Sequence, residues 1–351
     1  MKKFITVTSS VALLAMSVLP ALAQTNVNTG FTRSTAGGDP PVIKVKWEMY
    51  TGTQGLDELS TSSAQFLPSG QYNVDTHIEY CAVATDPDGL SDVNAVYADV
   101  FYPLVRTSHN TCDEQVGDEI LLTKLSKADG WNLLCDSIKN HNNNLPTWAQ
   151  GYDYDEVCAN DGELQKETAA VYCGARDLSY EAPAGNYTVK VHAADKAGLD
   201  SAVLENEFTY LPVTAFETDF TSVSYGNVKL NTHKIVNGDL TFGTSNLPTV
   251  RNVGNTLMTL LVKQDDMGLG STNGTSNVHW DGRVGSDATF SLYEPNIWEP
   301  LENMLQLSET DEVDFSILVD KFPLGTGLDG AYTGTMWLDA QTNEFEVCIQ
   351  E

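Results

Sequence analysis

Basic residues are scarce in this sequence. The 19 Lys and Arg side chains are outnumbered by 48 Asp and Glu, so the formal net charge is −29. Such a field repels nucleic acid and anionic lipid and attracts cations, which excludes nucleic-acid partners. The chain is nevertheless 41% hydrophobic and 9% aromatic, a composition that indicates a folded protein rather than a disordered acidic tail.

The short motifs that specify a reaction are also missing. The sequence contains no Gly-x-Ser-x-Gly, no His-Glu-x-x-His, no Gly-x-Gly-x-x-Gly and no phosphate-binding loop. Hydrolysis by paired carboxylates would need two acids in one cleft, and 48 acids offer too many candidates to select a pair. We therefore expect a protein that is not an enzyme.

No apolar run is long enough to span a bilayer. The chain begins with Lys2 and Lys3, continues with an apolar run from Val11 to Leu19 and reaches the small-x-small triplet Ala21-Leu22-Ala23. This layout predicts a signal peptide over residues 1–23, with cleavage before Gln24, because about 9 apolar residues fall short of the roughly 20 that a membrane helix needs. We expect a secreted or cell-surface protein with no membrane span after cleavage.

Residues 24–41 are polar and rich in turn formers, and they predict a flexible leader. From Val42 apolar and polar residues alternate, as in a half-buried strand. Four further strands are expected in the first domain, at residues 77–84, 94–101, 186–194 and 203–210.

A helical, cysteine-bearing insertion at about residues 104–178 interrupts this strand series. Trp131, Leu134, Cys135 and Ile138 recur at the spacing of a helical apolar stripe, and residues 164–172 repeat it more weakly. Asp129 and Asp161 are the expected N-terminal caps. The stripes could line a ligand groove, but packing of helices on a sheet requires the same pattern, and we favour packing.

A domain boundary is expected at about residue 212, after Leu211-Pro212. Short alternating segments then follow, separated by Gly, Asn and Asp, at residues 223–230, 239–242, 256–263, 277–280, 288–293, 313–319 and 331–338. The expected fold class is mainly β, with two β-sandwich domains: an immunoglobulin-like one over residues 42–212 that carries the insertion, and a second over residues 213–351.

Five of the six cysteines fall within the first domain: Cys81, Cys112, Cys135, Cys158 and Cys173. In an oxidising compartment they are disulfide candidates, and we expect two bridges that tie the insertion to the sandwich, with Cys81 favoured as the partner of Cys173. Cys348 is isolated, so one thiol is either free or paired across domains. The spacing of His109 and Cys112 also fits zinc, but no second such pair follows, so disulfides are favoured.

Two acidic turns each follow a strand rich in Val and Ala, one over residues 86–92 and one over residues 195–200. In an immunoglobulin-like sandwich these strands would be B and F, whose B–C and F–G loops emerge at the same end. Carboxylates and carbonyls that meet there are the ligands that Ca²⁺ prefers, although Asp-Pro-Asp-Gly is also a favourable turn without metal. The candidate calcium ligands are Asp86, Asp88, Asp92, Asp195 and Asp200.

These segments carry a resemblance. Ala-Thr-Asp-Pro-Asp-Gly-Leu-Ser-Asp-Val at residues 84–93 and Gly185-Asn186-Tyr187-Thr188-Val189, which continues to Gly198, look like bacterial and archaeal immunoglobulin-like surface domains. The resemblance implies that Tyr187 enters strand F and that the Asp-x-x-Gly turn joins F to G. The helical insertion departs from the family pattern. Residues 223–228 and 248–256 of the second domain are similar to sandwich domains of other secreted prokaryotic proteins.

The densest polar tract of the second domain runs over residues 264–283 and includes Trp280. A tryptophan beside a long loop can form a carbohydrate platform, but a sandwich edge uses the same residues. We expect a non-catalytic structural or adhesion-type binding protein whose partner is a cell-surface protein or a glycan. The alternatives are a carbohydrate-binding module or hydrolase accessory, which predicts aromatic residues clustered on one exposed face, and a self-associating fibre subunit of an extracellular matrix, in which residues 24–41 pair with a neighbour's sheet.

Overall fold

The computed structural model describes residues 38–50, 64–103, 105–106, 117–136, 146–244, 247–323 and 330–347. The predicted signal peptide, most of the leader, and Cys112 and Cys348 lie outside these residues. Within the described ranges, no helix has the length and the apolar character needed to cross a membrane.

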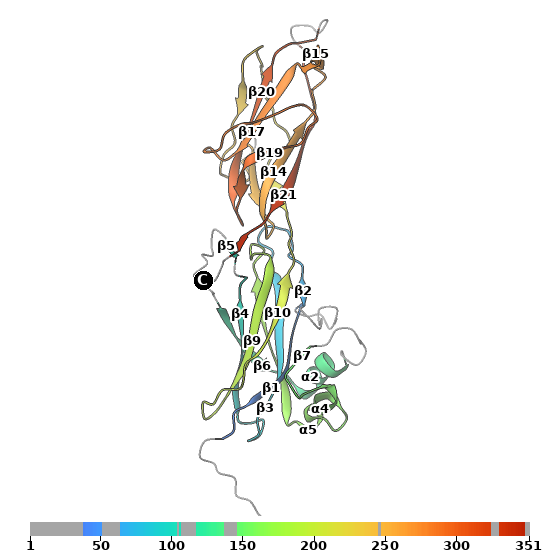
Figure 1. Cartoon of the computed structure of the whole chain (residues 1–351), viewed down its shortest axis with the longest axis vertical. Helices are drawn as coiled ribbons and strands as arrows, with labels where there is room; N and C mark the ends of the chain where they lie inside the picture. Colours follow the sequence, from blue (N-terminus) through green and yellow to red (C-terminus); the bar gives the residue numbers. More distant parts are fainter. Residues whose placement is uncertain are drawn as a thin grey trace, which may run out of the picture. The chain divides into compact units, whose positions relative to one another are not determined.

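The first sandwich is built from nine strands in the order β2-β10-β9-β4-β6-β8-β3-β1-β7. Their bounds are β1 Val42–Tyr50, β2 Gln65–Phe66, β3 Thr76–Thr85, β4 Val93–Phe101, β6 Gly117–Lys124, β7 Thr147–Trp148, β8 Ala169–Leu178, β9 Gly185–Asp195 and β10 Leu204–Tyr210. The neighbours are antiparallel except for β2 and β10. The strands expected at residues 77–84, 94–101, 186–194 and 203–210 correspond to β3, β4, β9 and β10 (Figure 1).

The strand β6 divides this order into two layers. Along most of its length β6 pairs with β4, and at Thr123 and Lys124 it pairs with β8. One layer therefore contains β10, β9 and β4, and the other contains β8, β3 and β1, as in an immunoglobulin-like fold. The short strands β5 (Val105–Arg106) and β22 (Glu346–Val347) pair antiparallel with each other and form a separate two-stranded sheet.

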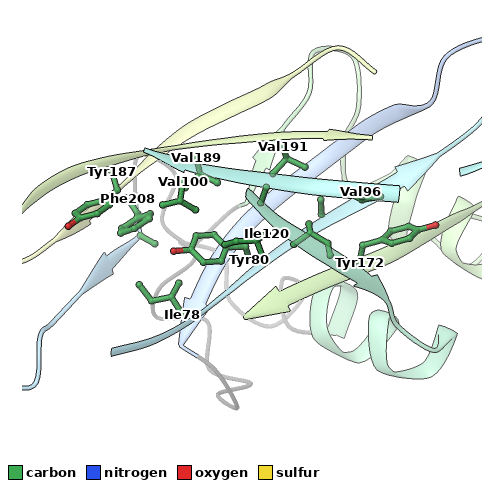
Figure 2. Close-up of a cluster of buried hydrophobic side chains, with 14 of the residues drawn as sticks. Ile78, Tyr80, Val96, Val100, Ile120, Tyr172, Tyr187, Val189, Val191 and Phe208 are labelled. Carbon is green, nitrogen blue, oxygen red and sulfur yellow. The ribbon is translucent and has the colours of Figure 1, made fainter. Parts of the chain in front are cut away.

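Apolar side chains from the two layers fill the space between them. Ile78 and Tyr80 of one layer point toward Val189 and Phe208 of the other (Figure 2). The Tyr187 ring stacks on Phe208, and its hydroxyl donates a hydrogen bond to the Pro183 carbonyl 2.9 Å away. A tyrosine that bonds back to the chain just before strand F is a feature of this fold, and its place matches the expectation for Tyr187.

The outer face of β1 and β3 is covered by the insertion. Its helical segments are α2 Lys127–Gly130, the π-helical η3 Trp131–Asp136, α4 Tyr154–Cys158 and α5 Glu163–Lys166. Trp47 and Val83 pack there against Leu134, Val157 and other buried residues of these segments. Because β1 is covered on both faces, the half-buried strand expected from its alternation is wrong.

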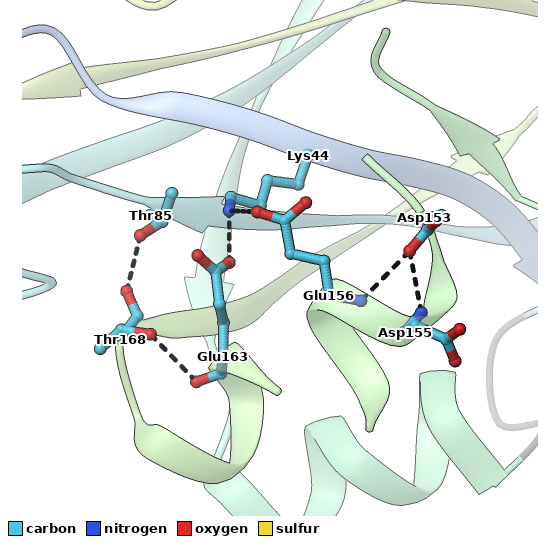
Figure 3. Close-up of polar contacts among 7 residues, drawn as sticks. All are labelled: Lys44, Thr85, Asp153, Asp155, Glu156, Glu163 and Thr168. Atoms are coloured by element: carbon cyan, nitrogen blue, oxygen red, sulfur yellow. Dashed lines mark hydrogen bonds and ion pairs between the residues drawn. The ribbon is translucent and has the colours of Figure 1, made fainter. Parts of the chain in front are cut away.

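Ion pairs and apolar packing attach the helices to the sandwich. The ammonium of Lys44, a largely buried β1 residue, lies 2.5 Å from Glu163 and 3.2 Å from Glu156, which come from two different helices (Figure 3). The N-terminus of α4 is capped by Asp153, whose Oδ1 accepts hydrogen bonds from the amides of Asp155 and Glu156.

The helical part is narrower than expected, because residues 117–124 and 169–178 are the strands β6 and β8. Residues 171 and 172 therefore belong to a strand and not to a helical stripe. The N-caps are Ser126, Asp153 and Gly162, not Asp129 and Asp161. Ser126 lies three residues before the expected cap Asp129, and Gly162 directly follows the expected cap Asp161.

Two disulfides lie in the described residues. Cys81 is bonded to Cys173, and the two face each other on the paired strands β3 and β8. Cys135 is bonded to Cys158 and joins η3 to α4. The expected pairing of Cys81 with Cys173 is confirmed, whereas the expectation that the bridges tie the insertion to the sandwich is wrong. One closes a strand pair, and the other closes the insertion on itself.

The second sandwich encloses a separate core around Trp280 and Phe315. One sheet has the order β11-β13-β20-β17-β18, with β12 also on β20, and the other has the order β19-β14-β21. The bounds are β11 Phe216–Thr218, β12 Lys234–Val236, β13 Thr249–Asn252, β14 Leu257–Gln264, β15 Ser271–Thr272, β16 Thr275–Ser276, β17 Val278–Val284, β18 Ser291–Tyr293, β19 Glu299–Leu305, β20 Thr310–Val319 and β21 Met336–Asn343.

Two of the segments expected as strands are not strands. Residues 223–230 contain only an isolated bridge at Leu230, and residues 239–242 contain no strand. Val223, Tyr225 and Val228 nevertheless pack on the core, so their alternation reflects a loop that covers the sandwich.

The segment 252–256 is not a hairpin, because it leads from β13 in one sheet to β14 in the other. A Cβ atom on Gly254 would lie 2.2 Å from the Val213 carbonyl oxygen, so glycine is needed for close approach of two backbones. The buried Asn255 accepts a hydrogen bond from the Val213 amide and donates one to the Leu211 carbonyl. This segment therefore binds the backbone at residues 211–213.

Candidate functional site

The two acidic turns of the first sandwich lie side by side. Strand β3 leads into residues 86–92 and strand β9 leads into residues 196–200. The Lys196 amide donates a hydrogen bond of 3.0 Å to the Asp92 carbonyl, and Val93 pairs with Asp195 at the start of β4. The reasoning from strand order, that these loops meet at one end of the sandwich, is confirmed.

Asp86, Asp92 and Asp195 are brought together there. One carboxylate oxygen from each lies within 4.8 Å of the other two. Asp86 is 4% exposed and Asp195 is 2% exposed, whereas Asp92 is half-buried. We call these three residues the acidic cluster.

Backbone hydrogen bonds fix the orientation of the two buried carboxylates. Asp86 Oδ1 accepts from the Asp88 amide at 2.7 Å, and Asp195 Oδ1 accepts from the Leu199 amide at 2.7 Å. The second oxygen of Asp195 is buried and accepts no hydrogen bond from the described part of the chain. Asp195 also forms no ion pair with any residue in the described ranges. A buried anion with an unsatisfied oxygen is costly, so this geometry favours a cation in the cluster.

The other two candidate ligands do not belong to the acidic cluster. Asp88 Oδ2 accepts a hydrogen bond from the Asp39 amide at 2.9 Å. Asp200, the last residue of its turn, is exposed and forms a bridge with Ala194. Three of the five candidate ligands therefore belong to the acidic cluster.

A second polar group lies between the layers of the same sandwich and was not expected from the sequence. Lys46 and Glu48 of β1 are fully buried, with 2.6 Å between Nζ and Oε1. Asn206 of β10 donates from Nδ2 to Glu48 Oε2 at 2.8 Å, and its Oδ1 contacts Lys46 Nζ. Burial lowers the pKa of Lys46, although the Glu48 charge acts in the opposite direction.

Trp280 is fully buried in the second sandwich and cannot form the carbohydrate platform that its neighbouring loop suggested. Exposed aromatic rings occur elsewhere. Trp298 and Trp337 are 39% and 40% exposed, and both rings lie within 5 Å of Lys263 Nζ. Such cation–π contacts orient the rings at the surface.

No protein-family model matches the sequence, and the search of curated proteins finds no significant relative. Among solved structures, the chain is similar to "BspA_C_WT", with 10% identity, coverage of 85% of this chain and 96% of the other, and a TM-score of 0.21. It is also similar to the C-terminal domain of the Streptococcus pyogenes antigen I/II-family protein AspA, with 12% identity, coverage of 87% and 96%, and a TM-score of 0.20. An alpha-L-rhamnosidase from Dictyoglumus thermophilum matches with 10% identity, coverage of 81% and 28%, and a TM-score of 0.17. Similarity at this level says nothing about function, which has to be argued from the residues themselves.

Proposed function

We propose that this chain is a secreted or cell-surface, non-catalytic structural and binding protein whose first sandwich holds a calcium ion between its B–C and F–G loops. The observation that carries the proposal is the buried Asp195 carboxylate beside Asp86 and Asp92, because its Oδ2 accepts no hydrogen bond from any described residue. Oxygen ligands of this kind suit Ca²⁺, and backbone carbonyls and water can complete a shell of six to eight.

Calcium would act on the loops first. Asp86 directly follows strand β3, and Asp195 is the last residue of strand β9. An ion bound to both would therefore hold the two loops together at this end of the sandwich. Clustered carboxylates repel one another without a cation, and binding removes that repulsion. An exported acidic protein whose loops are ordered by calcium is suited to present a stable surface to a protein or glycan partner.

Thermal unfolding in millimolar calcium and in chelator tests the proposal. At 100 times the dissociation constant, binding contributes about 2.7 kcal/mol, which corresponds to a rise of several degrees in Tm. Asp195→Asn should abolish the response to calcium. Asp200→Asn is the matched control, because Asp200 is in the same turn but outside the acidic cluster, and it should respond like the parent.

Two outcomes would contradict calcium binding: equal melting temperatures in calcium and in chelator, or an Asp195→Asn variant that still responds. Magnesium separates specific binding from general screening of a charge of −29. It should stabilise less at equal ionic strength, because it needs a tighter octahedron than two loops provide.

A glycan-binding surface on the second sandwich is the second candidate. The exposed pair Trp298 and Trp337 beside Lys263 favours it, because aromatic faces can stack on sugar rings. Affinity electrophoresis with soluble polysaccharides should show retardation that Trp337→Ala removes. Equal migration of parent and variant in every polysaccharide gel would eliminate this candidate.

A further inference from the structure

We propose that Lys46 and Asn206 are joined by an intramolecular isopeptide bond. The bond forms spontaneously within the folded domain, with Glu48 as the proton-transfer residue. The three side chains form a closed triangle in which each contacts the other two. We call them the Lys46 triad. The bond would be independent of the acidic cluster.

The position of the Lys46 triad follows from strand register. Lys46 lies opposite Ala82 and Glu48 lies opposite Tyr80, and both partners belong to the core between the layers. Asn206 lies two residues before Phe208 on β10, so it is on the same face of the strand as Phe208, which lies in this core. The amine and the amide therefore face each other from opposite layers, with Lys46 and Glu48 buried and Asn206 partly buried.

Chemistry between an amine and an amide requires an unprotonated nucleophile. Burial withdraws the Lys46 ammonium from water and disfavours its charge. Glu48 Oε1 lies 2.6 Å from Nζ, so a proton can pass directly from the ammonium to the carboxylate and turn a buried ion pair into a neutral pair.

Glu48 also contacts the group that must leave. Its Oε2 accepts a hydrogen bond from Asn206 Nδ2 at 2.8 Å, while its other oxygen holds the attacking nitrogen. One carboxyl group can therefore take a proton from the nucleophile and deliver a proton to the leaving nitrogen, as general acid–base catalysis requires. Contact between Nζ and the amide also removes most of the entropic cost of bringing the two groups together.

The step balances without a cofactor. Nζ attacks Asn206 Cγ, the Nζ–Cγ bond forms, and the Cγ–Nδ2 bond breaks after Nδ2 has received a proton. The net change converts the Lys46 ammonium and the Asn206 carboxamide into a secondary amide and an ammonium ion, and Glu48 returns to its carboxylate. No electron is transferred, and ammonia is the only leaving group.

Lys44 provides an internal comparison. It is on the same strand, it is also largely buried, and its ammonium lies near the carboxylates of Glu163 and Glu156. Within the described residues the Lys44 ammonium contacts these two carboxylates and the Tyr152 ring, and no carboxamide, so no amide nitrogen is placed there to leave. Lys46 has a carboxamide and a proton carrier in contact at the same time.

Peptide mapping of the mature protein tests the bond. After reduction and alkylation, trypsin should release residues 45–106 and 197–229 as one branched peptide, lighter than the two separate peptides by one ammonia and without cleavage after Lys46. Intact mass alone is insufficient, because an N-terminal Gln24 would also lose ammonia on cyclisation. Separate linear peptides, including one that begins at Trp47, would overturn the proposal.

Variants identify the residue that transfers the proton. Glu48→Gln keeps the size of the side chain but cannot accept the proton, and Asn206→Ala removes the electrophile, so both should give linear peptides. The control Glu163→Gln removes one of the two ion pairs of Lys44 and should retain the branched peptide. A branched peptide in Glu48→Gln would exclude Glu48 as the proton carrier. If a variant does not fold, the peptide map of the unchanged protein decides whether the bond exists.

Discussion

The stability of the first sandwich should depend strongly on the Lys46 triad, and Glu48→Gln is the most informative perturbation. The variant prevents the bond between residues that lie 160 positions apart in the sequence. Lys46 belongs to the first strand of the sandwich and Asn206 to the last, so the bond closes nearly the whole domain into a loop.

The size of the effect follows from chain entropy. The Cys81–Cys173 disulfide already shortens the path between the two residues, which leaves an effective loop of about 70 residues. Closing such a loop restricts the unfolded chain by about 4 kcal/mol in the entropic account of cross-links. For a domain of this size we expect Tm to fall by about 10 to 15 °C in Glu48→Gln.

Calorimetry in chelator measures this loss without a contribution from calcium. Asn206→Ala prevents the same bond but keeps the Lys46–Glu48 pair, so the two variants should lose similar amounts of stability if the bond is responsible. Glu163→Gln controls for the loss of one ion pair on β1 and should lower Tm much less. Melting temperatures of Glu48→Gln and Asn206→Ala that stay within about 2 °C of the parent would refute the reasoning.

Three further predictions concern other contacts. Cys158→Ser opens the loop of the insertion and should cost about 3 kcal/mol, measured by urea unfolding under oxidising conditions, and a loss below about 1 kcal/mol would contradict this estimate. Asn255→Ala leaves the Val213 amide and a carbonyl unsatisfied and should cost about 1 to 3 kcal/mol, whereas unchanged urea unfolding would show that these bonds contribute little. The Asp177 carboxylate raises the pKa of His77 above its usual 6.5. The contribution of this pair to folding stability is therefore complete below pH 6.5 and is lost as pH rises through the pKa of His77 in the folded protein. An NMR titration should show the raised value and its reversal in Asp177→Asn, and identical titrations in the two proteins would contradict the pairing.

The acidic cluster could be predicted from the sequence because the immunoglobulin-like fold places two loops that are distant in the sequence next to each other. In an immunoglobulin-like sandwich the B–C and F–G loops share one end, so Asp86 and Asp195 could be placed together although more than a hundred residues separate them. Asp200 was misplaced, because its bridge with Ala194 depends on a turn geometry that the acidic pattern does not reveal.

The Lys46 triad was not predictable from local pattern. Alternating lysine and glutamate along β1 normally marks a face in water, and only the covering layer that carries Asn206 shows that this face is buried. The strand expected around Tyr225 is a loop, because apolar side chains of a loop that covers a sandwich can alternate with polar ones as they do in a strand. In both places the missing information was a contact between residues far apart in the chain.

Isothermal titration of the mature protein with calcium is the measurement that tests the proposed function most directly. Binding at the acidic cluster predicts a saturable site with one ion per chain that is retained in Asp200→Asn and absent in Asp195→Asn. A titration with no saturable heat, or an Asp195→Asn variant that binds calcium as the parent does, would contradict the account.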